Sequence, residues 1–364
     1  MPSSYFDSVK DETKHREWSK DRNSLFKKHI ASGSKWDVGH LAACHIIVAG
    51  KGNECLPLLD NIYRRAGKKF AAGDEKKEMT AFTRVLAQEH RNMREHALIR
   101  EPKVGVSLAR FWVALRDVKT SNADGEEPEV NQRVSTRTQE EMSLSQSQKS
   151  NVSFPSSAPI SASGVYTEEQ APAPGLPVED CTVQLAFAVL NHILLYTQDP
   201  LLDTPVEIRQ RERWILNINS KRITAIDDGG LSLVIDAGTR TKKSVVLIEA
   251  KRRLDVCKDS NQPVVSHELL AQMTCEALAA RSSGRDEHVG DNVFIINITQ
   301  HYMCFFLLAI TVPQVEDIKN GETPGKAIRV TATNWLYFAD ASERKVVVRN
   351  VYQLAKYMRE EDPE

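Results

Sequence analysis

The first third of the chain repeats apolar positions at helical spacing. Apolar side chains recur every three or four residues in segments that short turns separate, which is typical of amphipathic helices. Gly33 ends the first segment, and Gly50-Lys51-Gly52 separates the second from the third. We therefore expect residues 1–118 to form a helical N-terminal domain, an antiparallel bundle, with helices over 5–31, 36–50, 54–66, 74–98 and 103–118.

This periodicity disappears between residues 119 and 178. The segment is rich in Ser, Thr, Gln, Glu and Pro, ends in APAPGLP, and has only Phe154 and Tyr166 as aromatic residues. Such a composition buries too little apolar surface to offset the entropy lost when the chain is ordered. We expect residues 119–178 to be a disordered linker between two domains.

Beyond the linker, helical and strand patterns alternate. Residues 182–197 predict a buried apolar helix, and Thr204 with Pro205 and Glu207 predicts the start of a second, shorter helix. The alternation predicts an α/β fold with a mixed sheet for residues 179–364. Strands are expected over 214–226 and 231–237 (joined by a hairpin turn at Asp227-Asp228-Gly229-Gly230), 244–250, 292–298 and 303–311, then a hairpin of 333–339 and 345–350, with helices over 267–281 and 351–360.

Composition excludes several classes of protein. The 364 residues are 41% apolar and 27% charged, as in soluble globular proteins. No apolar run reaches the length of a membrane span, and the N-terminus lacks the apolar stretch of a signal peptide. The cysteines are scattered, and His40-x-x-x-Cys44-His45 is better explained by core packing than by zinc. We expect an intracellular protein without a membrane partner, in the nucleus or the cytoplasm.

Charge is distributed unevenly along the chain. Residues 1–118 hold 22 Lys and Arg against 15 Asp and Glu, a net charge of +7, whereas the whole chain carries −1. A basic segment favours an anionic partner such as nucleic acid, although a solvated helical surface has the same composition. A protein partner for this helical region is also open.

Two candidate catalytic residues lie on one predicted strand. In SVVLIEAK, Glu249 and Lys251 project from the same face because strand side chains alternate. The preceding strand, LSLVID, ends in Asp236, and an antiparallel register is expected to bring Asp236 beside Glu249. Charged groups at the end of a buried strand are costly unless paired or bound to metal. Two neighbouring carboxylates form the oxygen-rich site that Mg²⁺ or Mn²⁺ prefers.

Such a site suits phosphodiester hydrolysis. Asp236 and Glu249 would hold the metal, which activates a water, and Lys251 would orient that water or stabilise developing charge. The same Glu-x-Lys spacing occurs at Glu12, Glu75 and Glu343, but none of these follows an apolar strand. Only Glu249 combines that strand with an upstream Asp. The simpler alternative is a salt bridge at a strand end.

The segment IDAGTRTKKSVVLIEAK resembles the Asp-x(n)-Glu-x-Lys signature of the PD-(D/E)XK nuclease superfamily, with twelve residues between Asp236 and Glu249. The resemblance covers roughly residues 179–312. The following LLAQMTCEALAA is similar to a helix of PD-(D/E)XK-like proteins from filamentous fungi. It implies an αβββαβ restriction-endonuclease-like core and Mg²⁺-dependent cleavage of nucleic acid. Ile235 departs from the signature proline, which weakens the recognition more than the mechanism.

The resemblance also implies two supporting side chains. The family helix often directs a Gln toward the metal, which indicates Gln272, with Glu276 one turn later; the edge of an apolar stripe explains Gln272 equally well. A carboxylate on the helix before the first strand indicates Glu212, although a solvated helix has the same pattern. Three functions stay open: a nuclease acting on DNA or RNA, an inactive nuclease-fold module that binds nucleic acid or protein, and a scaffold that acts through its N-terminal bundle.

Overall fold

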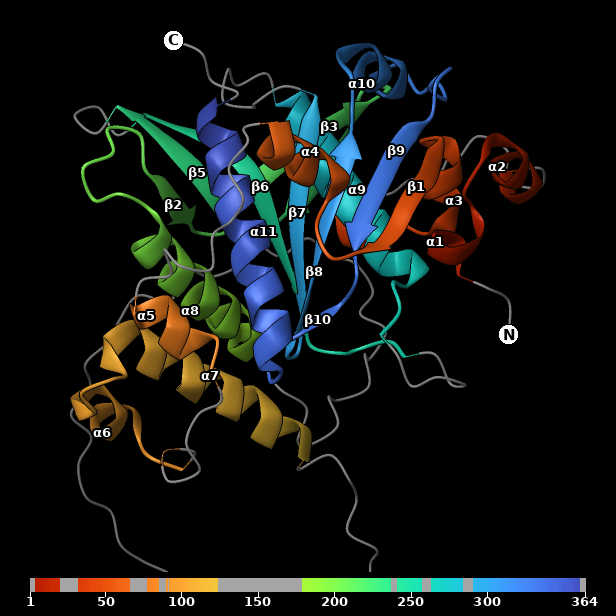
Figure 1. Cartoon of the computed structure of the whole chain (residues 1–364). Helices are drawn as coiled ribbons and strands as arrows, with labels where there is room; N and C mark the ends of the chain where they lie inside the picture. The colour runs from red at the N-terminus through yellow and green to blue at the C-terminus, as the bar shows by residue number, and fades with distance from the viewer. Residues whose placement is uncertain are drawn as a thin grey trace, which may run out of the picture.

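The computed structural model describes residues 4–19, 32–65, 77–84, 90, 92–123, 179–236, 241–256, 263–283 and 291–360. Within them, a mixed eight-stranded sheet has the order β1-β9-β8-β7-β6-β5-β2, with β10 paired to β8 (Figure 1). Strands β3 (Arg213–Ile218) and β4 (Lys221–Ile226) form a separate antiparallel ribbon. The predicted α/β fold with a mixed sheet is confirmed.

The strands on one side of the sheet follow a buried helix in the chain. This helix, α8, spans Glu179–Thr197, as the apolar pattern predicted, and the chain then enters β2 (Val206–Arg209). Strand β2 pairs antiparallel with β5 (Gly229–Asp236), and β5 pairs antiparallel with β6 (Thr241–Lys251). After α9 (His267–Ser282) the chain returns in β7 (Asn292–Thr299), which is parallel to β6. Strand β6 thus lies inside the sheet between β5 and β7, and β5 lies between β6 and the edge strand β2.

Helices cover both faces of the sheet (Figure 1). On one face α9 forms a core with the β3–β4 ribbon and α10, and on the other α8 and α11 form a second core. The remaining elements are α1 (Tyr5–Ser8), α2 (Glu12–Ser19), a 3₁₀ turn (Gly33–Lys35), α3 (Val38–Ala43), α4 (Pro57–Arg65), α5 (Lys77–Phe82), α6 (Glu95–Arg100), α7 (Gly105–Ala123), β8 (Tyr302–Ala309), α10 (Val312–Lys319), β10 (Leu336–Tyr337) and α11 (Ala341–Glu360).

The N-terminal region is part of the same sheet. Strand β1 (Ile46–Asn53) pairs in parallel with β9 (Ile328–Thr333), so the predicted helix over 36–50 is wrong in its second half. Both cores combine side chains from before residue 119 with side chains from after residue 178. Where it is described, the region 1–118 is therefore packed into one body with the C-terminal half rather than folded as a separate helical bundle.

Three further expectations are wrong in the C-terminal half. Residues 214–226, expected as one strand, form the two antiparallel strands β3 and β4. Residues 206–209, expected in a helix that begins at Thr204, form strand β2. The predicted hairpin of 333–339 and 345–350 is instead the short strand β10 followed by α11. Helix α9 and strands β7 and β8 agree with their predictions. Most of the predicted linker, residues 124–178, lies outside the described residues, and no helix within them is long and apolar enough to cross a membrane.

Candidate functional site

Strand β6 delivers two charged groups to one face of the sheet. Val246 to Ile248 and Ala250 are fully buried, as expected for a central strand, and the side chain of Glu249 is 1% exposed. Glu249 and Lys251 share the face that α9 covers, and the Lys251 Nζ lies 2.5 Å from Glu249 Oε1. The predicted placement of these two side chains on one face is confirmed.

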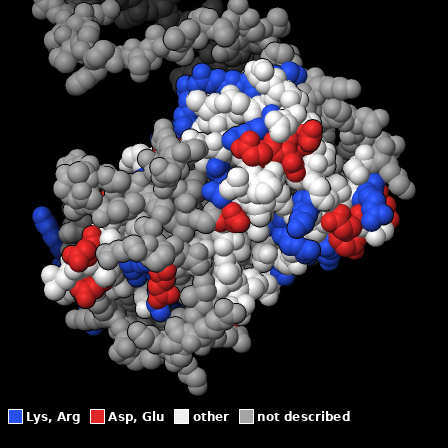
Figure 2. All heavy atoms as spheres, turned by 90° about the horizontal axis from the view of Figure 1, so that it is seen from above, with Lys and Arg blue, Asp and Glu red and all other residues white. Residues whose placement is uncertain are grey.

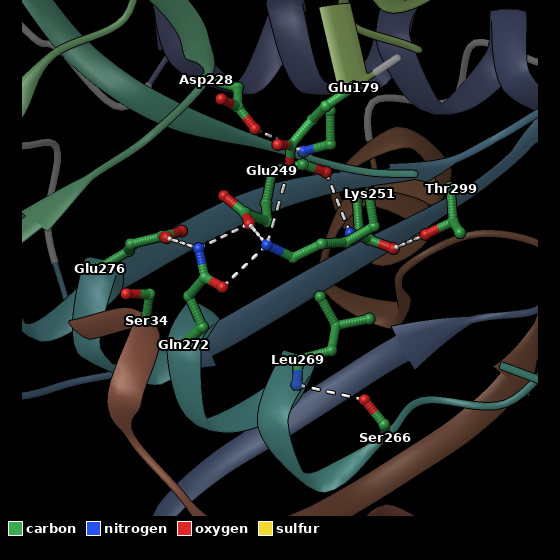
Figure 3. A network of polar contacts seen from close by, with 12 residues as sticks. Ser34, Glu179, Asp228, Glu249, Lys251, Ser266, Leu269, Gln272, Glu276 and Thr299 are labelled. Carbon is green, nitrogen blue, oxygen red and sulfur yellow. Dashed lines mark hydrogen bonds and ion pairs between the residues drawn. The ribbon is translucent and has the colours of Figure 1, made fainter. Parts of the chain in front are cut away.

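Helix α9 supplies an amide that connects the charged groups (Figure 3). Gln272 Nε2 donates to Glu249 Oε1 at 2.6 Å and to Glu276 Oε1 at 2.9 Å. Gln272 Oε1 accepts from Lys251 Nζ at 2.8 Å. The predicted pair Gln272 and Glu276, one helical turn apart, thus faces the Glu249–Lys251 pair directly.

Burial sets the protonation of the two glutamates. Removal from water, opposed by Lys251 and assisted by the nearby Asp228 carboxylate, raises the pKa of Glu249 to about 7. Burial and the neighbouring Glu249 raise the pKa of Glu276 well above its usual value. The Oε2 atoms of both glutamates are buried without a hydrogen-bond partner. The carboxyls therefore offer oxygen atoms that the protein itself leaves unsatisfied.

Asp236 lies at the opposite end of the β5–β6 hairpin from Glu249. The backbone register pairs Asp236 with Thr241, whereas Gly229 pairs with Ile248. Eight residues of strand separate Thr241 from Glu249, about 26 Å at roughly 3.3 Å per residue. The prediction that Asp236 and Glu249 hold one metal is therefore wrong. In an antiparallel hairpin, residues beside the turn pair with each other, so the last residue of the first strand cannot meet the last residue of the second.

Asp228 lies where Asp236 was expected. It immediately precedes β5, and its N–H donates to the Ile248 carbonyl at 2.9 Å. Its Oδ2 accepts from the Ala250 N–H at 2.9 Å, and its Oδ1 from Arg211 Nη2 at 2.7 Å. Asp228 is mostly buried, at 9% exposure. Figure 3 shows its carboxylate at the strand end that carries Glu249. The sequence signal for this position was an acidic residue just before the first strand of the hairpin. It was missed because residues 227–230 were interpreted as a hairpin turn.

The adjacent Asp227 has a structural role. Its buried carboxylate receives two hydrogen bonds from the Arg209 guanidinium, at 2.9 and 2.6 Å, and one from Trp214 Nε1 at 2.6 Å. It also accepts from the backbone of Gly229 at 3.1 Å. Asp227 therefore fixes the passage from the β3–β4 ribbon into β5.

Two glycines follow because the chain passes very close to β6. A Cβ atom at Gly230 would lie 2.1 Å from the Val246 carbonyl oxygen, and Gly229 has a φ of +147°. A side chain at either position would be strained or would displace the neighbouring strand. Gly229 and Gly230 are the first two residues of β5 and not, as was predicted, part of a hairpin turn.

Glu212 is not on a helix, so its predicted position is wrong. It precedes β3, its carboxylate lies 3.6 Å from Arg209, and its N–H donates to Asp227. The helix carboxylate that approaches the site is Glu179, the first residue of α8, whose Oε1 is 4.0 Å from Lys251 Nζ. The error arose because a second helix was expected at Thr204, and the supporting acid was sought after it.

Glu179, Lys251 and Gln272 line a cleft of about 690 Å³, and the buried Glu249 lies behind Lys251 and Gln272. The cleft walls carry charges of both signs, with Arg252 and Arg253 beside four carboxylates. The lining residues are Glu179, Asp180, Lys251, Arg252, Arg253, Leu254, Asp255, Val264, Ser266, Glu268, Leu269, Gln272, Thr299 and Trp335. The opposite, upper face of the molecule carries groups of basic and acidic side chains among uncharged ones (Figure 2). A phosphate that enters the cleft would meet Lys251, Arg252 and Arg253 beside the four carboxylates.

Comparison with known proteins adds no relative. No protein-family model matches the chain, and no curated protein matches it either.

Proposed function

We propose that this protein is a Mg²⁺- or Mn²⁺-dependent phosphodiesterase that cleaves nucleic acid, with Asp228, Glu249 and Lys251 at its centre. The observation that carries the proposal is the convergence of these side chains at the β5–β6 strand ends, beside the cleft. Two carboxylates and one amine in this arrangement suit metal-assisted hydrolysis better than a surface salt bridge, because Glu249 is 1% exposed.

The order of elements supports the same proposal. Helix α8, strands β2, β5 and β6, helix α9 and strand β7 follow the αβββαβ order of the PD-(D/E)XK core, with the β3–β4 ribbon inserted. The pairing is antiparallel, antiparallel and then parallel. With Asp228 in place of Asp236, the motif becomes Asp228, twenty intervening residues, and Glu249-Ala-Lys251.

The donor atoms suit a hard divalent cation. Asp228 and Glu249 offer carboxylate oxygens, and the buried Glu249 Oε2 has no other partner. When bound, such an ion neutralises a phosphate oxygen and lowers the pKa of a coordinated water. Asp228 and Glu249 would hold the ion, and Gln272 fixes the orientation of Glu249. Lys251, 29% exposed at the cleft, would donate to a phosphate oxygen or to the attacking water.

The test is a cleavage screen on plasmid, single-stranded DNA and RNA with each ion. Lys251→Met should abolish the cleavage that the wild-type protein performs. Lys345→Met makes the same change in the Glu343-Arg344-Lys345 segment, on the exposed face of α11, and should keep full activity. Cleavage by Lys251→Met at the wild-type rate would contradict the proposal. Mn²⁺ binding that Glu249→Ala removes, without cleavage of any substrate, would favour an inactive module instead.

A further inference from the structure

Three metal-ligating side chains meet far from the cleft. Glu12 and His15 lie one turn apart on α2, and His45 immediately precedes β1. One potential ligand atom from each lies within 4.8 Å of the others. Strand β1 is four strands from β6 in the sheet order, about 19 Å at roughly 4.8 Å per strand. The cluster is therefore separate from the Asp228–Glu249 site.

Backbone carbonyls fix one nitrogen of each imidazole. His15 Nε2 lies 2.9 Å from the Ala42 oxygen, and His45 Nδ1 lies 2.8 Å from the Pro324 oxygen. Only a protonated nitrogen makes a favourable contact with a carbonyl oxygen, so the neutral rings keep lone pairs on His15 Nδ1 and His45 Nε2. A second nitrogen that donates to a backbone carbonyl is the usual support of a metal-bound histidine.

The free nitrogen of His45 faces an acceptor. His45 Nε2 lies 2.7 Å from a Glu12 carboxylate oxygen, so two lone pairs oppose each other if the ring is neutral. A cation between these atoms resolves the conflict, and so does a proton on the ring. The His15 ring, 6% exposed as a residue, stacks on His45 with centroids 4.4 Å apart.

The backbone of His45 is also unusual. Its φ is +53°, in the left-handed region that residues other than glycine adopt uncommonly. Glycine or asparagine would adopt this conformation more easily. Backbone strain of this kind is retained where the side chain makes contacts that a glycine or an asparagine could not make.

We infer that Glu12, His15 and His45 form a binding site for Zn²⁺. Two imidazoles and a carboxylate suit zinc and similar transition ions, whereas Mg²⁺ prefers oxygen ligands alone. Ligand atoms in a tetrahedral zinc site are about 3.3 Å apart, and Glu12, whose side chain is 52% exposed, is free to close the remaining gap. Water completes the coordination. The ion ties α2 to the edge strand β1 and to the turn at Pro324.

The experiment measures zinc bound to the full chain after dialysis, together with the visible spectrum of the Co²⁺-substituted protein. Wild type should retain one zinc per chain. Glu12→Gln and His45→Asn should weaken zinc binding about ten-fold or more. Asparagine tolerates the left-handed backbone, and Glu12 is exposed, so both variants should fold.

Two controls separate this site from other zinc binding. His96→Asn, which changes an exposed histidine on α6, and Glu249→Gln, which changes the cleft, should both retain one zinc. Wild type that retains no zinc would show that His45 is simply a charged partner of Glu12 and would overturn the inference. Equal zinc retention by wild type, Glu12→Gln and His45→Asn would overturn it as well.

Discussion

Glu249→Gln should stabilise the folded protein at pH 8 even though it removes a proposed metal ligand. Burial raises the pKa of Glu249 from its ordinary value of 4.5 to about 7. Because the folded-state pKa lies above the unfolded value, the folded protein binds this proton more tightly. The stabilising contribution is complete below pH 4.5 and is lost as the pH rises through 7. The loss is about 3 kcal/mol at roughly 1.4 kcal/mol per pH unit.

Glutamine imitates the protonated acid in shape and charge, so the variant escapes this loss. At pH 8 its free energy of unfolding should exceed that of wild type by up to about 3 kcal/mol, and near pH 4.5 the two should be similar. Lys251 loses its ion pair with Glu249 but keeps Gln272 as an acceptor, and its side chain is 29% exposed to water. The raised stability reflects the cost of keeping a functional carboxylate buried.

The assay is urea unfolding at pH 4.5 and pH 8 in the presence of EDTA. Glu268→Gln is the matched control, because Glu268 lines the same cleft but is exposed. That variant should differ from wild type equally at both pH values. If Glu249→Gln is destabilised at pH 8, or shows no dependence on pH, the argument that burial raises the pKa of Glu249 is refuted.

Two structural predictions concern buried charges elsewhere. Asp227→Asn should lower the free energy of unfolding by about 3–5 kcal/mol in urea titrations, because Arg209, 9% exposed, loses its closest charged partner and retains the more distant Glu212 at 3.6 Å; a loss below 1 kcal/mol would contradict the structural role of Asp227. Arg344→Met should cost roughly 3 kcal/mol or more, since the fully buried guanidinium donates to the carbonyls of Phe82, Arg84 and Phe338. Unchanged stability in a thermal melt would show that these carbonyls find other donors.

The sequence predicts best where local pattern and burial agree. Val246, Leu247 and Ile248 are apolar on both faces of an interior strand, so the charged Glu249 and Lys251 that follow stand out. Gln272 was indicated by the resemblance of the α9 sequence to a helix of the PD-(D/E)XK family, and i,i+4 spacing places Gln272 and Glu276 on one face. These positions depend on one element each, and single-sequence reasoning resolves single elements.

The errors concern pairing between elements. Asp228 and Asp236 flank the same strand, and only the register with β6 decides which one meets Glu249. The partner of β1 lies about 280 residues away in β9, so no local signal distinguished residues 46–53 from a helix. The zinc interpretation of His40-x-x-x-Cys44-His45 was set aside because that segment is apolar and lacks a second ligand pair, and no local signal linked His45 to Glu12 and His15, about thirty residues earlier in the chain.

The central claim is that Asp228, rather than Asp236, shares a site with Glu249. The most direct test compares Asp228→Asn with Asp236→Asn in Mn²⁺-dependent cleavage of a substrate that wild type cuts. Both variants should fold, because Arg211, the charged partner of Asp228, is 57% exposed and an amide oxygen still accepts from Ala250. Asp228→Asn should lose about 100-fold or more in rate, and Asp236→Asn should stay within about two-fold of wild type. Full activity of Asp228→Asn with loss in Asp236→Asn would contradict the account.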